Sequence, residues 1–261
     1  MITSLQNPKI KIVRDLLINS KARQESAAFV VEGVRLAEEA INNEWIVQFA
    51  LWSNQLSERS KRLLQRLENL SVLVEEISPT MMEKISDTES PQGILLVLAQ
   101  KTWSIPKPLD FLVVLDGVRD PGNLGTILRS AIAFGAQAVI LIKGSTDPLS
   151  PKVIRSAMGA HFRLPIVDMS ASQLVCFCRE QNQPALKIHL ADMKAADPCW
   201  EVDLCAPLAL VIGGEADGAS QELQEAADGR ILIPMPGGSE SLNAAVATSV
   251  LLYEVMRQRN A

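Results

Sequence analysis

Residues 208–218 read LALVIGGEADG, an apolar run followed at once by glycines and acidic residues. The run predicts a buried strand, and the glycines predict a loop where a ligand can approach the backbone. Residues 120–129, DPGNLGTILR, follow the apolar run 111–115 in the same way, and residues 233–243, IPMPGGSESLN, begin where the run 230–233 ends. Loops gathered at the carboxyl ends of strands form the ligand crevice of an open α/β sheet. The chain is therefore predicted to be an enzyme or a tight ligand binder.

The sequence around these blocks alternates between strand and helix patterns. Strands are predicted at residues 111–115, 138–142, 162–167, 186–190, 208–212 and 230–233, and helices at 124–134, 151–158, 172–181, 221–227 and 242–259. Continuous apolar strands are typical of a parallel sheet with helices on both faces. Residues 106–261 are thus predicted to form a doubly wound α/β domain. Its last helix is apolar almost all round, so it should be buried against the sheet or in a subunit interface.

The first hundred residues predict a smaller α/β domain. Helical spacing occurs at residues 8–18, 34–41 and 58–70, and strand patterns occur at 28–31, 46–52, 72–77 and 94–99. Residues 101–108, KTWSIPKP, contain two prolines and no apolar period, which indicates a linker. We therefore expect one domain over residues 1–105 and a second over 106–261.

Composition restricts the class of protein. The chain has 261 residues, of which 48% are hydrophobic, and no stretch has the ~18 consecutive apolar residues of a membrane span. Without a signal-peptide pattern, a soluble cytoplasmic protein is expected. The cysteines, Cys176, Cys178, Cys199 and Cys205, have spacings unlike those of zinc pairs, so we expect reduced thiols and no metal site.

Charge leaves the question of nucleic-acid binding open. A net charge of −5 argues mildly against an RNA partner, since phosphates bind to clustered Lys and Arg. Residues 1–35, however, contain six basic and three acidic residues, a local charge of 6 − 3 = +3. A basic surface that contacts RNA and a solvated helix face explain this excess equally well.

Several polar residues of the three blocks are candidates for a site. Asn123 can either cap the helix that follows it or face a ligand, and Arg129 projects from the second turn of that helix. Glu215 would lie at the mouth of the crevice. Ser241 and Asn243, at a helix start, can cap it or bind a carboxylate, a phosphate or a ribose hydroxyl. Nicotinamide binding and ATP hydrolysis are disfavoured because no glycine-rich nucleotide motif is present.

Together, the blocks resemble the SpoU/TrmH family of RNA ribose 2′-O-methyltransferases, members of the SPOUT superfamily. The resemblance rests on Asn123, Gly125 and Arg129, on residues 213–218, and on IPM at 233–235 with SLN at 241–243. It covers about residues 107–261 and includes SAMGAHFRLP at 156–165. Residues 29–36, FVVEGVRL, and 88–94, TESPQGI, resemble the family's RNA substrate-binding domain, which is similar to a small ribosomal protein.

The resemblance implies a deep trefoil knot, an exception to the rule that chains avoid knots. It also implies S-adenosylmethionine as cofactor, held mainly by backbone groups. The residues that match the cofactor site are Gly213, Gly214, Ile233, Met235 and Leu242. Family members are usually homodimers, with the active site completed across the interface of the knotted domains.

The implied reaction is methylation of a ribose 2′-hydroxyl in structured RNA, and the two-domain arrangement favours ribosomal RNA over tRNA. The family assigns Arg129 to activation of that hydroxyl, but an arginine with a pKa above ~12 is a poor base. We therefore expect Arg129 to orient the hydroxyl and a phosphate and to stabilise negative charge. Asn123, Glu215, Ser241 and Asn243 would hold the RNA or fix the loops.

Two other functions are compatible with the same fold. One is a catalytically silent RNA-binding or ribosome-assembly factor, against which the intact residues Asn123, Arg129, Glu215 and Asn243 argue. The other is methylation of a small molecule or a protein, which the RNA-type N-terminal domain disfavours.

Overall fold

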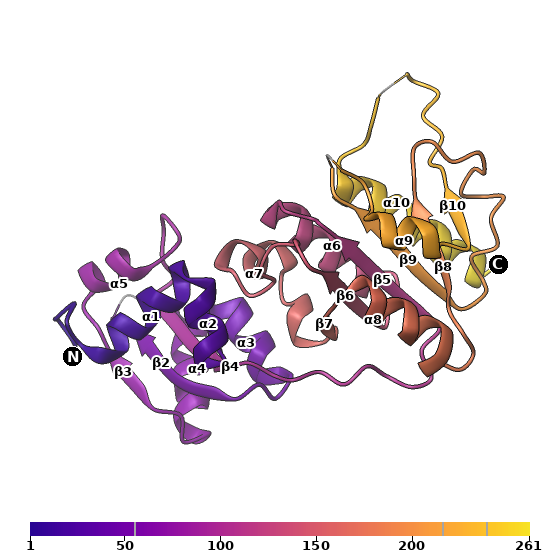
Figure 1. The fold of residues 1–261 in the computed structure, drawn as a ribbon. Coiled ribbons are helices and arrows are strands. Elements are labelled where there is room, and N and C mark those ends of the chain that lie inside the picture. The colour runs from indigo at the N-terminus through magenta and orange to yellow at the C-terminus, as the bar shows by residue number, and fades with distance from the viewer. Residues whose placement is uncertain (55, 216, 239) are drawn as a thin grey trace. The chain divides into compact units, whose positions relative to one another are not determined.

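The computed structural model describes residues 1–54, 56–215, 217–238 and 240–261 (Figure 1). Ala216 in the second sequence block and Ser239 in the third lie outside the described residues. The chain divides into two compact units. The first comprises Met1–Thr102 and Asp147–Phe162, and the second comprises Trp103–Thr146 and Arg163–Ala261.

The second unit is built on a six-stranded parallel sheet, as predicted. Its strands are β5 (Phe111–Asp116), β6 (Ala138–Ile142), β7 (Ile166–Met169), β8 (Lys187–Ala191), β9 (Leu208–Gly213) and β10 (Gly229–Ile231). They lie in the order β10-β8-β9-β5-β6-β7, and every pair is parallel. The apolar runs of β5 and β6 are buried throughout, which is the reason they contain no alternating polar positions.

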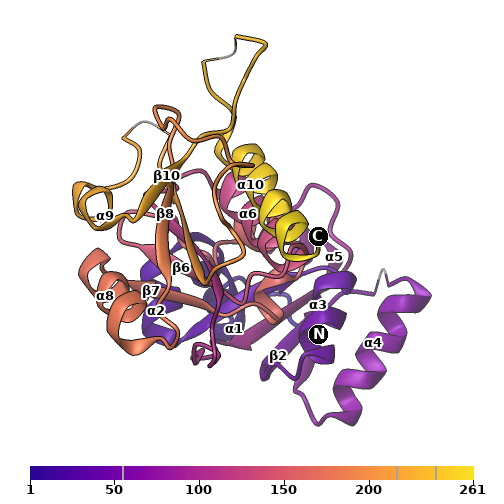
Figure 2. The ribbon, with the colours of Figure 1, turned by 90° about the vertical axis from the view of Figure 1, so that its right-hand side faces the viewer.

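Helices cover both faces of this sheet. Figure 2 shows α6 (Pro121–Ala133) and α10 (Ala244–Arg259) on one side of the strands. On the other side lie α8 (Ala171–Cys176), which continues as the π-helical turn η2 (Phe177–Gln181), and α9 (Gln221–Ala226). Leu174, Phe177 and Leu223 join the sheet residues Val114 and Ile140 in one apolar core. The predicted doubly wound layers are confirmed.

The order of the strands in the sheet indicates where the ligand crevice lies. From β5 the chain goes outward through β6 to β7, then returns to β8 on the far side of β9. The direction of the connections therefore reverses between β5 and β9. In open α/β sheets, ligands bind where the connections reverse in this way. The loop after β5 leads to Asp120 and the first turn of α6, which contains Asn123, and the loop after β9 begins at Gly214.

Two predicted strands differ from the observed ones. The run 162–167 forms a 3-10 turn, η1 (Ala160–Phe162), and then the short strand β7, and Phe162 instead packs its ring edge-on against Trp45 at 5.4 Å. Gly159 turns the chain before η1 with φ +91°. The strand expected at 230–233 ends at Ile231, because Leu232 makes only an isolated bridge and Pro234 has no amide proton for a ladder.

The first unit contains a second sheet. Its strands are β1 (Ala28–Glu32), β2 (Val47–Trp52), β3 (Val74–Glu76) and β4 (Ile94–Ala99), in the order β1-β4-β2-β3. β4 is antiparallel to both β1 and β2, and β3 is parallel to β2. The helices are α1 (Pro8–Ile18), α2 (Ser20–Ser26), α3 (Val34–Asn42), α4 (Glu58–Asn69), α5 (Pro79–Ile85) and α7 (Pro151–Ala157). The sequence did not predict α2 or α5.

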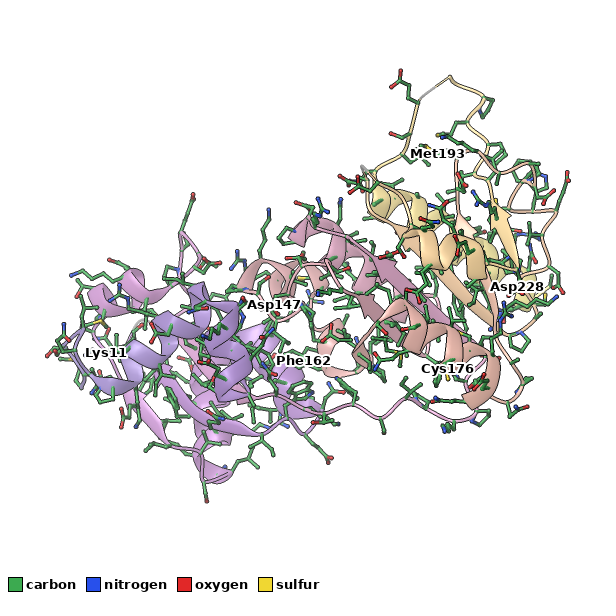
Figure 3. The ribbon with its side chains drawn as sticks, in the orientation of Figure 1. Lys11, Asp147, Phe162, Cys176, Met193 and Asp228 are labelled. Atoms are coloured by element: carbon green, nitrogen blue, oxygen red, sulfur yellow. The ribbon has the colours of Figure 1, made fainter. Side chains whose placement is uncertain are left out.

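The segment Asp147–Phe162 is fixed within the first unit by polar contacts. Arg23 is only 4% exposed, and its Nε donates to Asp147 Oδ2 at 2.7 Å while Nη1 donates to the carbonyl of Leu16 at 2.6 Å. Trp45 Nε1 donates to the carbonyl of Phe162 at 3.2 Å. Figure 3 labels Asp147 and Phe162 at the two ends of this segment.

We expect His161 to make the stability of the first unit dependent on pH. The ring is 1% exposed, Nε2 lies 2.6 Å from the carbonyl of Pro148, and Nδ1 has no hydrogen-bond partner among the described residues. Burial lowers the pKa of His161 to about 4. The unfolded chain binds a proton near pH 6.5 and the folded chain does not, so stability falls as pH decreases from about 6.5 to 4.

We expect this histidine alone to reduce the free energy of unfolding by about 3 kcal/mol across that window. Urea unfolding at several pH values, with His161→Gln beside the wild-type chain, isolates its share from that of the carboxylates. Equal pH slopes for the two proteins would contradict the expectation.

None of the helices in the described part of the chain is both long and apolar enough to cross a bilayer.

Candidate active site

A hollow of about 650 Å³ lies at the carboxyl ends of β8, β9 and β10. Every residue expected to bind the cofactor lines it: Gly213, Gly214, Ile233, Met235 and Leu242. Three of the other candidates line it as well: Glu215, Ser241 and Asn243. Met193 follows β8 at this end of the sheet, whereas Asp228 precedes β10 at the opposite end (Figure 3).

Two glycines form a wall of this hollow because no side chain fits there. A Cβ on Gly213 would lie 2.3 Å from the backbone nitrogen of Ala219. A Cβ on Gly214 would lie 2.7 Å from the carbonyl oxygen of Gly117, in the loop after β5. The two loops therefore touch through their backbones, and a ligand in the hollow would face main-chain groups.

Asp116, the last residue of β5, holds the loop after β9. It is 6% exposed, and its Oδ2 accepts a hydrogen bond from Ser220 N at 2.6 Å. This buried carboxylate ties the end of β5 to the beginning of α9, so the glycine loop between β9 and α9 is held at both ends.

A hydrogen-bond relay joins the three sequence blocks. Asn123 Nδ2 donates to Glu215 Oε1 at 2.5 Å, and Asn243 Nδ2 donates to Asn123 Oδ1 at 2.9 Å. Asn243 also caps α10, since its Oδ1 accepts from Ala245 N at 3.0 Å. The relay thus runs from the loop after β9, through the start of α6, to the start of α10.

Asn123 does not cap α6. That function belongs to Asp120, whose Oδ1 accepts from Asn123 N at 2.8 Å. Because Asp120 satisfies the helix terminus, the amide of Asn123 is available to the relay. Asn123 also lines a smaller hollow of about 140 Å³, together with Glu215.

Within one chain, Arg129 does not lie beside the hydrogen-bonded side chains of Asn123, Glu215 and Asn243. It lies on the exposed face of α6, and among the described residues it lines neither the hollow at the ends of β8, β9 and β10 nor the smaller hollow of Asn123. Its guanidinium makes no hydrogen bond or ion pair with the described residues. Beside α6, helix α10 presents an apolar stripe of Val246, Val250 and Tyr253, which are 50%, 38% and 52% exposed. The last helix is thus buried on one side only.

Sequence reasoning missed the polar wall beyond β8. Asp192 Oδ2 accepts from Arg230 at 2.7 Å, and Lys194 lines the same hollow. The backbone amide of Lys194 and the Arg230 guanidinium lower the pKa of Asp192, so the carboxylate stays ionised at neutral pH. The position of Asp192 directly after an apolar strand was the sequence signal that could have identified this residue.

The chemistry of the hollow is that of hydrogen bonding and main-chain contact. In the described part of the chain, no group of three His, Cys, Asp or Glu side chains is placed to hold a metal ion. The four cysteines are free thiols, and burial raises the pKa of Cys178 to about 12. The Glu215 carboxylate is held by the amide of Asn123, which the amide of Asn243 holds in turn. Beside a backbone-walled hollow, such a carboxylate can position a hydroxyl group next to a bound small molecule.

Two family models match the chain. Residues 110–253 match the SpoU rRNA Methylase family, and residues 7–96 match the MRM3-like substrate binding domain. The 23S rRNA (guanosine(2553)-2′-O)-methyltransferase RlmP of Bacillus subtilis is 32% identical over 97% of this chain and 98% of its own length. The mitochondrial rRNA methyltransferase 3 of Homo sapiens is 31% identical over 96% of this chain and 72% of its own length.

A solved structure has the same fold over both units. The SpoU methyltransferase AviRb from Streptomyces viridochromogenes, in complex with AdoMet, has a TM-score of 0.88 and 29% identity. The match covers 97% of this chain and 99% of AviRb.

Proposed function

The chain belongs to the SpoU rRNA methylase family, and on this basis we propose that it transfers a methyl group from S-adenosylmethionine to a ribose 2′-hydroxyl of ribosomal RNA. The observation that carries the proposal is the relay of Glu215, Asn123 and Asn243 at the rim of the glycine-walled hollow. It brings together residues from all three sequence blocks.

The hollow fits the cofactor. Its volume of about 650 Å³ lies within the range of small-molecule sites. Backbone groups at Gly213 and Gly214 and the side chains of Ile233, Met235 and Leu242 would hold the adenosyl and methionyl parts. S-adenosylmethionine supplies a methyl group already activated by the sulfonium charge.

The chain's residues then have to position the acceptor. Asn123 holds one oxygen of the Glu215 carboxylate and leaves the other for a ribose hydroxyl. Alignment of that hydroxyl with the methyl group supplies much of the rate. The Arg129 guanidinium is a planar hydrogen-bond donor, so it orients the 2′-hydroxyl and a neighbouring phosphate and stabilises the negative charge that develops on oxygen.

A homodimer through α6 and α10 completes this arrangement. The stripe of Val246, Val250 and Tyr253 is apolar and exposed, and it lies on the helix that packs beside α6. Since Arg129 lines neither the cofactor hollow nor the small hollow of Asn123 and Glu215 in the described part of its own chain, its place on α6 favours action in the partner's active site.

Mixed dimers test this arrangement. Arg129→Ala and Asn243→Ala should each be inactive alone. After the two variants are unfolded and refolded together in equal amounts, half of the dimers are mixed and one of their two sites is intact, so about a quarter of wild-type methyl transfer should return. Sedimentation velocity confirms that dimers form. Dimers without recovered activity would place Arg129 in its own chain's site.

Further parts of the proposal concern the domains and the location. We assign RNA substrate binding to residues 1–105 and catalysis to residues 106–261, with a trefoil knot in the latter and a cytoplasmic location. The match of residues 7–96 to a substrate-binding domain supports the first assignment.

The experiment is transfer of labelled methyl from S-adenosylmethionine to unmodified 23S rRNA, 16S rRNA and tRNA, each transcribed in vitro. We expect label in 23S rRNA alone. If tRNA alone were labelled, the substrate would be tRNA and not ribosomal RNA. Cofactor binding without methyl transfer to any RNA would contradict the proposed function.

A further inference from the structure

A second hollow, of about 350 Å³, adjoins the cofactor hollow. The two share Gly214, Asp217 and Gly218 as a common wall. The second hollow also shares Arg119 with the small hollow of Asn123 and Glu215. It therefore adjoins the relay, yet none of the expected site residues except Gly214 lines it.

Two cations line this hollow without a strong partner. Lys143 follows β6, is exposed, and makes no ion pair with the described residues. Arg119 follows β5, and its ion pair with Asp217 is long, at 3.6 Å, between side chains that are 75% and 78% exposed. Exposed pairs of this kind are weak, so Arg119 is available to another anion.

Two other arginines of this unit are held by close carboxylates. Arg179 lies 2.9 Å from Asp228, and Arg230 lies 2.7 Å from Asp192. The other carboxylate of the second hollow, Asp116, is buried and is satisfied by Ser220 N. The open side of this hollow therefore presents positive charge, although the whole chain is acidic.

The wall of the second hollow also contains glycines, whose backbone no side chain covers. Gly117, Gly144 and Gly218 have φ values of +76°, +104° and +67°, and a Cβ on any of them would meet no atom within 4 Å. The hydroxyl of Ser220 makes no hydrogen bond with the described residues. A bulky anion can thus approach the main chain closely between the two cations.

We propose that this second hollow binds a phosphodiester of the substrate RNA next to the target nucleotide, through Arg119 and Lys143. The inference rests on the proposed function, because a ribose held at the relay continues into neighbouring phosphates. A guanidinium binds phosphate oxygens bidentately, and an ammonium adds a point charge. Lys143 directly follows β6, and Arg119 lies in the loop that follows the adjacent strand β5, so the sheet brings the two loops side by side.

The test compares two double variants that each remove two positive charges. Arg119→Gln with Lys143→Gln changes the hollow, and Lys107→Gln with Lys187→Gln removes exposed charges outside it. For each protein and the wild type, the affinity for 23S rRNA transcribed in vitro is measured at several salt concentrations. The KM for RNA and the Kd for S-adenosylmethionine are measured beside it.

Loss of two phosphate contacts should reduce the slope of log affinity against log salt by roughly 1.4 to 1.8, and at low salt it should weaken RNA binding about tenfold or more. KM for RNA should rise by a similar factor, while the cofactor Kd stays unchanged. The control variant should keep the wild-type slope.

If the Arg119→Gln, Lys143→Gln variant had the same salt slope of RNA affinity and the same KM for RNA as the control variant, the inference would be overturned. Failure of the proposed function gives a different result from failure of this inference. In the former case the wild type binds the RNA but transfers no methyl group, and a smaller slope in the hollow variant still supports phosphate binding there.

Discussion

Asn123→Asp is expected to lower methyl transfer by about 100-fold or more, an effect typical of the loss of one well-placed donor in an active site. The new carboxylate would stand 2.5 Å from Glu215 Oε1, where an amide now donates. Two carboxylates at this distance repel each other, so Glu215 and its loop should move away from α6. Single-turnover rates with saturating RNA and cofactor measure the loss.

A second substitution provides the control. Glu215→Gln in the Asn123→Asp background restores a donor and an acceptor in reversed order, and the bond from Asn243 can remain. The double variant should recover to within about tenfold of wild type. If it stayed as inactive as Asn123→Asp, the charge of Glu215 itself would be required, and a purely positioning role for the pair would be wrong.

Gly213→Ala should weaken binding of S-adenosylmethionine about 100-fold or more. The added Cβ would lie 2.3 Å from both Ala219 N and the carbonyl carbon of Gly218, and these are backbone atoms that cannot rotate away. Relief requires a shift of the loop after β9. Isothermal titration calorimetry gives the affinity, and circular dichroism shows whether the sheet persists.

Gly237→Ala is the matched comparison. Gly237 lies in the loop after β10, a Cβ there meets nothing within 4 Å, and its φ is outside the left-handed region. Cofactor affinity should remain within a few-fold of wild type. Equal losses from both substitutions would show that the close backbone approach at Gly213 is not what forms the hollow.

Sequence periodicity predicted most of the fold because burial leaves a direct pattern. The strands β5, β6 and β9 are almost entirely apolar, and the loops after β5 and β9 were identified from glycine, proline and polar residues at the strand ends. Helix α5 begins at Pro79 and has only seven residues, which is too short for a helical period to be distinct.

Spatial partners could not be predicted in the same way. The apolar residues Val153 and Phe162 indicate burial, but nothing in their spacing says that the segment 147–162 packs within the first unit. Similarly, the sequence left open whether Asn123 caps a helix. Only the observed cap at Asp120 and the bonds to Glu215 and Asn243 resolve that choice.

The central claim is that the site methylates a ribose hydroxyl of ribosomal RNA. The most direct measurement is to digest labelled 23S rRNA to nucleosides after reaction, locate the methyl group by mass spectrometry, and map the modified position. We predict a single nucleotide with the methyl group on the ribose 2′-oxygen. A methyl group on a base, or none on RNA while S-adenosylmethionine is bound, would contradict the claim.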